Sequence, residues 1–143
     1  MGFNRSIHLA VLGFALSFVV PTMVLVTTGS ERAQAQDQQG FSVLHSAELA
    51  AMLKNKAFFL VNVHVPYEGE IKDTDALIPF DKIADNLSML PASKDAKIVL
   101  YCRSGRMSEI AARELAKLGY TGVYHLAGGM NDWKNSGHQI LEK

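Results

Sequence analysis

The chain has 143 residues, which suits one ordinary domain and leaves little room for a second. Hydrophobic residues make up 48% of the chain and charged residues 20%, as expected of a globular protein with a core. Lys and Arg number 14, and so do Asp and Glu. This balance argues against nucleic acid as a partner, because phosphate binding requires a basic excess or stripe. Cys102 is the single cysteine, so no disulfide within the chain is expected.

Residues 1–35 have the order of a secretory signal. A basic start is followed by the apolar run Ile7–Val26 and by Ala33-Gln34-Ala35, which is typical of a cleavage site. The apolar run is about 20 residues long, a length that also allows an uncleaved membrane anchor. Pro21 and the small residues at the end of the segment favour cleavage. We therefore expect an exported, periplasmic or otherwise extracytoplasmic protein that contacts a membrane only if this segment is retained.

Residues 36–40 are polar and predict a linker, which leaves 41–143 as the single domain. Strand-like and helix-like segments alternate along this domain. The predicted strands are Phe41–Leu44, Ala57–Val63, Lys97–Cys102 and Val123–Leu126. The predicted helices are Ala47–Lys54 with Ser46 as its cap, Asp85–Leu90, Ser108–Leu118, and a last helix from Gly129 to about Lys134. This order predicts an α/β fold with a mainly parallel central sheet and helices on both faces.

Cys102 ends one of the predicted buried strands and stands before a short loop. Ligands of open parallel sheets bind at the carboxyl ends of the strands. Gly105 allows the loop to curl, which turns backbone N–H groups inward and forms an anion cradle. The start of the helix expected at Ser108 and the charges of Arg103 and Arg106 add positive potential. All these groups stabilise a thiolate, so Cys102 is predicted to be a nucleophile.

Three segments together resemble the rhodanese family over about residues 41–140. They are Tyr101–Ser108 (YCRSGRMS), the following EIAARELAKLGY, and VYHLAGGMNDW. The resemblance implies a rhodanese-like domain with sulfurtransferase activity of the exported thiosulfate type. Cys102 would carry sulfur as a persulfide from a small donor such as thiosulfate to a cyanide or thiol acceptor. The residues that the resemblance assigns to substrate binding are Arg103, Ser104, Gly105, Arg106, Met107 and Ser108.

One segment departs from the family pattern. Rhodanese domains usually carry an Asp and an Arg two residues apart where this chain has Asn62-Val63-His64. This change leaves open an alternative function as a non-catalytic sulfur carrier or partner-binding module. His64 is expected to fill a structural hydrogen-bonding role rather than to shuttle protons.

Two other chemistries are disfavoured. Cysteine phosphatases place an Arg six residues after the nucleophile to hold phosphate, and here that position is Ser108. The short loop likewise argues against an arsenate or phosphate enzyme. The histidines are scattered without metal-ligand spacing, so neither a metal site nor a cofactor is predicted.

Overall fold

The structure, a computed structural model, describes residues 39–142. Its centre is a parallel sheet in the strand order β1-β5-β4-β2-β3. The strands are β1 (Ser42–Leu44), β2 (Phe59–Asn62), β3 (Ala76–Leu77), β4 (Ile98–Tyr101) and β5 (Val123–Leu126). The helices are α1 (Ser46–Leu53), α2 (Arg106–Lys117) and α3 (Gly129–Asn135), with 3₁₀ turns η1 (Phe80–Lys82) and η2 (Ala84–Met89). The predicted α/β fold is confirmed.

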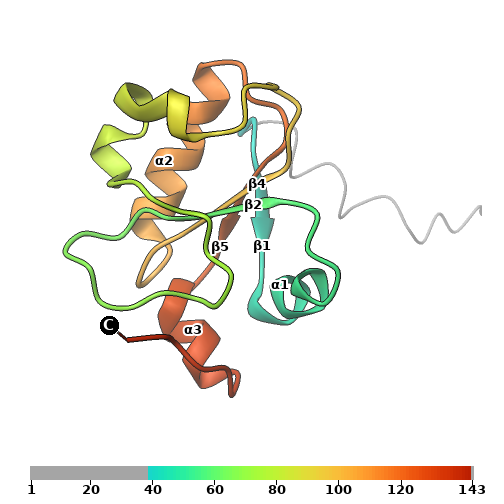
Figure 1. The fold of residues 1–143 in the computed structure, drawn as a ribbon, viewed down its shortest axis with the longest axis vertical. Helices are drawn as coiled ribbons and strands as arrows, with labels where there is room; N and C mark the ends of the chain where they lie inside the picture. Colours follow the sequence, from blue (N-terminus) through green and yellow to red (C-terminus); the bar gives the residue numbers. More distant parts are fainter. Residues whose placement is uncertain (1–38, 143) are drawn as a thin grey trace, which may run out of the picture.

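Helices cover both faces of the sheet (Figure 1). The core on one face includes Ala111 and Leu115 of α2, and the core on the other includes Leu49 of α1 and Trp133 of α3. Successive side chains of a strand point to opposite faces, so each strand supplies both cores. This arrangement explains why the predicted strands are continuous apolar runs rather than alternating ones.

Strand β4 lies in the middle of the sheet and determines where Cys102 points. All four of its residues are fully buried between β5 and β2. Ile98 and Leu100 belong to the core under α2, whereas Val99 and Tyr101 belong to the opposite core. Cys102 continues this alternation and lies in the core under α2. The strand therefore delivers the thiol to the carboxyl edge of the sheet on the α2 side.

Two helix starts differ from the predictions. Helix α1 includes Ser46, and its cap is His45, whose backbone N–H donates to Glu48 Oε2 at 2.9 Å. Ser46 instead donates its hydroxyl to Asp132 of α3 at 2.6 Å, so it links two helices. Helix α2 begins at Arg106 rather than Ser108, with Gly105 as its cap. The first difference arose because Ser is a favoured cap residue, whereas the Ser46 hydroxyl is used in a tertiary contact. The second arose because Gly105 caps α2 two residues before the predicted start.

Residues 64–82, to which the sequence assigned no strand or helix, contain β3 and η1. The two residues of β3 are too few to produce a periodic pattern, and they form a strand because they pair with Val61 and Asn62 of β2.

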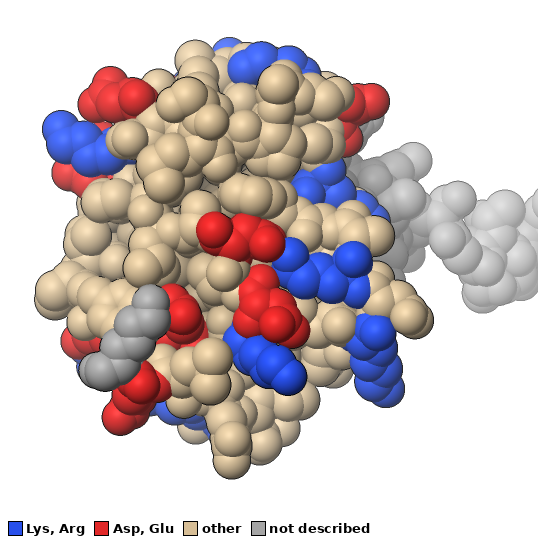
Figure 2. Space-filling view, in the orientation of Figure 1, with Lys and Arg blue, Asp and Glu red and all other residues tan. Residues whose placement is uncertain are grey.

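The predicted signal segment and most of the linker lie outside the described residues, so those expectations stay predictions. Within residues 39–142, no helix is both long enough and apolar enough to cross a bilayer. On the face drawn in Figure 2, acidic and basic side chains are interspersed.

Candidate active site

Cys102 follows β4 directly, and its side chain is 1% exposed. The backbone N–H of Gly105 donates to Sγ at 3.1 Å. Sγ also lies 3.8 Å from Ser108 Oγ on its buried side. A backbone donor aimed at the sulfur from the start of α2 stabilises negative charge there, because the helix N-terminus carries partial positive charge.

Three residues, 103–105, separate Cys102 from the start of α2. Gly105 is the last residue of this loop, and its φ of 94° is a left-handed conformation that residues other than glycine rarely adopt. This conformation lets α2 begin immediately after the loop and turns the Gly105 N–H back toward Sγ. A tight loop therefore places the thiol and the helix N-terminus in direct contact.

The start of α3 holds the cysteine loop from the other side. The backbone N–H of Met130 donates to Cys102 O at 2.9 Å, and that of Asn131 donates to Arg103 O at 2.9 Å. The approach is so close that a Cβ added to Gly129 would lie 2.2 Å from Cys102 O. In the sequence, Gly129 was placed at the start of the last helix and in the segment that resembles the family, and neither interpretation predicted this backbone contact.

Ser108 and His125 lie behind the cysteine, inside the protein. The Ser108 hydroxyl donates to Gly105 O at 2.9 Å and lies 3.4 Å from His125 Nδ1. Burial lowers the pKa of His125 below its usual range, although Glu109 opposes this shift. His125 is therefore neutral at pH 7 and makes a hydrogen-bonding contact rather than carrying a charge. Ser108 is fully buried, so it braces the loop instead of facing a substrate.

A cavity of about 350 Å³ opens over Cys102. Its walls are formed by His64, Cys102, Arg103, Ser104, Arg106, Met107 and Asn131. Four of the six predicted substrate-binding residues thus line the cavity, and Gly105 and Ser108 lie beneath it as its support. His64 and Asn131 were not predicted as site residues. They come to Cys102 because β2 neighbours β4 and because α3 is docked on the cysteine loop.

The segment that departs from the family pattern shapes one wall of this cavity. Asn62 accepts a hydrogen bond from His64 N–H at 3.0 Å and donates its amide to Gly69 O at 3.0 Å. His64 Nε2 lies 2.9 Å from Glu68 Oε2, and Glu68 in turn pairs with Arg103 at 3.2 Å. His64 therefore makes the expected hydrogen bond and also stands beside the thiol.

The charges at the cavity favour an anion. Arg103 and Arg106 line it, and none of its described lining residues carries a carboxylate. Glu68 neutralises Arg103 from outside, whereas Arg106 forms no ion pair within residues 39–142. In the same part of the chain, no three His, Cys, Asp or Glu side chains come together as a metal site requires.

Comparison with known proteins gives relatives that contain this domain. The chain is 38% identical to a tRNA uridine(34) hydroxylase of Erwinia tasmaniensis over 96 residues, which are 63% of this chain and 27% of that protein. It is 33% identical to the Escherichia coli protein of the same name, with the same coverage. The chain thus spans about a quarter of the length of these relatives.

Solved structures share the fold. A rhodanese-like domain protein of Staphylococcus aureus matches 71% of this chain and 99% of its own, with a TM-score of 0.59 and 28% identity. A rhodanese-related protein of Thermoplasma volcanium covers 71% and 99%, with a TM-score of 0.61 and 24% identity, which shows the fold alone. The family model described as rhodanese-like domain matches residues 45–136. This protein therefore belongs to the rhodanese-like domain family.

Proposed function

We propose that this protein is a sulfurtransferase that moves sulfane sulfur from a donor such as thiosulfate to an acceptor through a persulfide on Cys102. One observation carries the proposal. Sγ receives the Gly105 N–H at 3.1 Å, directly at the start of α2 and beneath a cavity with two arginines and no described carboxylate. A thiolate and an anionic donor are both stabilised in such a place.

The loading step needs a nucleophilic sulfur and a good leaving group. The Cys102 thiolate attacks the outer sulfur of thiosulfate, a new S–S bond forms, and the old S–S bond of the donor breaks. Sulfite leaves with the electron pair of that bond. Arg106 is the cation free to attract the donor and to steady the departing sulfite, because Arg103 is already paired with Glu68.

The unloading step returns the enzyme to its first state. A nucleophilic acceptor such as cyanide attacks the terminal sulfur of the persulfide, and thiocyanate leaves. The bond between Sγ and the transferred sulfur breaks, and its electron pair remains on Cys102 as the thiolate. The Gly105 N–H is in place to receive this charge, so the same donor stabilises the starting and final thiolate.

The geometry disfavours phosphate chemistry. The residue six positions after the cysteine is Ser108, which is fully buried and bonded to Gly105 O. It is in no position to hold a phosphate in the cavity. Only three residues, 103–105, separate Cys102 from α2, and this short loop favours sulfur chemistry over phosphate or arsenate chemistry.

Turnover of thiosulfate with cyanide tests the proposal, with wild type and Cys102→Ser compared at equal folded concentration. We expect thiocyanate formation in the wild type and none above background in the variant. Equal rates in the two proteins would refute the enzyme proposal. A wild type that gains sulfur from thiosulfate but passes it to neither cyanide nor any thiol would support the alternative function as a sulfur carrier.

A further inference from the structure

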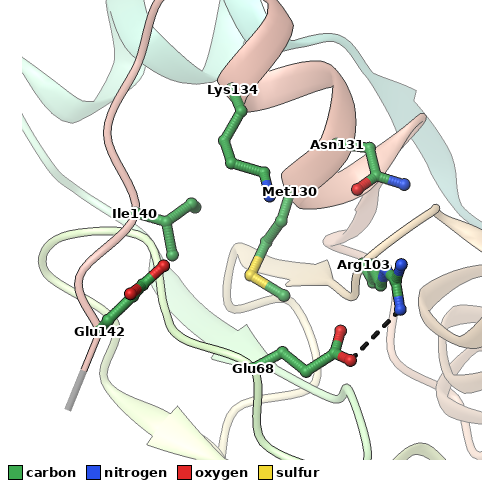
Figure 3. Close-up of a pocket in the computed structure, with 7 residues that line it drawn as sticks. All are labelled: Glu68, Arg103, Met130, Asn131, Lys134, Ile140 and Glu142. Atoms are coloured by element: carbon green, nitrogen blue, oxygen red, sulfur yellow. Dashed lines mark hydrogen bonds and ion pairs between the residues drawn. The ribbon is translucent and has the colours of Figure 1, made fainter.

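A second cavity, of about 250 Å³, is drawn in Figure 3. The two cavities share Arg103 and Asn131 as walls. The floor of the second cavity includes Met130, whose backbone N–H is bonded to Cys102 O at 2.9 Å. The second cavity therefore adjoins the cysteine loop. Because Cys102 lines only the first cavity, a ligand in the second reaches the sulfur past the shared wall of Arg103 and Asn131.

The second cavity differs from the first in its charges. It carries two cations, Arg103 and Lys134, and two carboxylates, Glu68 and Glu142. Arg103 and Glu68 pair with each other at 3.2 Å. Lys134 and Glu142 form no ion pair within the described residues, and both turn toward the cavity in Figure 3. One positive and one negative group are thus left to meet a ligand.

We infer that this cavity binds the sulfur acceptor and that the acceptor is a small thiol carrying both a carboxylate and an ammonium group, such as an amino-acid thiol. Lys134 receives the carboxylate and Glu142 receives the ammonium. The cavity is smaller than the roughly 300–1,000 Å³ of typical ligand pockets, which limits the ligand to about the size of an amino acid. The four charges of this cavity sum to zero, whereas the first cavity has two arginines and no described carboxylate, so a dianion such as thiosulfate is favoured in the first cavity.

This inference rests on the proposed function and adds the identity of its acceptor. The acceptor thiol loses its proton to solvent, and its thiolate attacks the terminal sulfur of the Cys102 persulfide. The bond from Sγ to that sulfur breaks with its electron pair remaining on Cys102. The acceptor leaves as a persulfide, and no external oxidant or reductant is consumed.

The test uses four thiols that differ only in their charged groups: cysteine with both, cysteamine with the ammonium, 3-mercaptopropionate with the carboxylate, and 2-mercaptoethanol with neither. Thiosulfate is the donor, and kcat/KM for each thiol is divided by that for cyanide. The variants are Lys134→Met and Glu142→Gln. Lys117→Met is the matched control, since Lys117 is an exposed lysine of α2 that lines neither cavity.

Each variant should lose preference for one charged group only. In Lys134→Met the ratio falls roughly three- to tenfold for the two thiols that carry a carboxylate, as expected for loss of one solvent-exposed charge contact. In Glu142→Gln it falls similarly for the two thiols that carry an ammonium. Lys117→Met keeps the wild-type ratios. Because each thiol is compared with itself, differences in intrinsic nucleophilicity cancel.

Two results would overturn the inference while leaving sulfurtransfer intact: ratios that do not change in either variant, or equal losses for all four thiols. A wild type that transfers sulfur neither to cyanide nor to any thiol would overturn the proposed function, and the acceptor site with it.

Discussion

Replacing Gly129 by Ala tests whether α3 holds the cysteine loop in place. The added Cβ would lie 2.2 Å from Cys102 O and 2.7 Å from Arg103 C. Real Cβ contacts are essentially never below 3.0 Å, so the two backbones must separate by at least about 0.8 Å, the difference of 3.0 and 2.2. Both are backbone segments, and neither can rotate away as a side chain would.

The loss of stability in Gly129→Ala follows from the hydrogen bonds that break when the two backbones separate. The hydrogen bonds from Met130 N to Cys102 O and from Asn131 N to Arg103 O, each 2.9 Å long, span this gap. At about 1 kcal/mol each, with about 1 kcal/mol for a non-glycine residue at positive φ, the variant loses about 3 kcal/mol of stability. Because the cysteine loop moves by nearly the same distance, we expect sulfur transfer to fall about 100-fold.

Gly119→Ala is the matched control. The φ of Gly119 is 87°, which lies outside the left-handed region that alanine can adopt, whereas the 55° of Gly129 lies inside it. Nothing lies within 4 Å of a Cβ added to Gly119. Urea denaturation and thiosulfate turnover are measured for both variants. If backbone strain alone mattered, Gly119→Ala would be the more damaged protein. That result, or full activity in Gly129→Ala, would refute the role assigned to α3.

Three further predictions concern groups around the thiol. Ser108→Ala removes one of two donors to Gly105 O, which keeps its bond from the Glu109 N–H. Urea denaturation should therefore show a loss of about 0.5–1.5 kcal/mol, and an unchanged midpoint would contradict the bracing role. Burial lowers the pKa of His125. Below about pH 6.5, His125 is therefore protonated to a greater extent in the unfolded chain than in the folded protein. Stability is therefore complete above that pH and falls as the pH drops. Melting curves at about pH 7.5 and pH 5 should show a smaller loss for His125→Asn than for the wild type, and equal losses would count against a neutral His125. Arg106→Met should raise KM for thiosulfate roughly three- to tenfold. The control is Arg113→Met, since Arg113 is an exposed arginine of the same helix. Equal KM values in the two variants would show that Arg106 does not contact thiosulfate.

The fold was largely predictable because its strands are buried on both faces. Continuous apolar runs such as Ala57–Val63 and Lys97–Cys102 predict such strands with little ambiguity, and the helices between them imply parallel pairing. The helix starts were less predictable, since α2 is capped by a glycine at positive φ and the nearby Ser108 has an internal partner. Strand β3 exists only through its pairing with β2 and left no local pattern.

The site was predictable where it is local in sequence and not where it depends on assembly. Cys102, the loop after it and the two arginines all lie within 102–106, next to a recognisable strand and helix. His64 and Asn131 lie 38 and 29 residues from Cys102 by their numbering, and no spacing rule connects them to it. Their place at the cavity follows from the order of β2 and β4 and from the hydrogen bonds of α3.

Intact-mass measurement shows whether Cys102 carries sulfur. The protein is incubated with thiosulfate, freed of excess donor and weighed before and after addition of cyanide. If Cys102 forms a persulfide, the wild type gains the mass of one sulfur atom and loses it to cyanide, whereas Cys102→Ser gains none. A wild type that gains no sulfur, or a Cys102→Ser variant that gains as much, would contradict this role of Cys102.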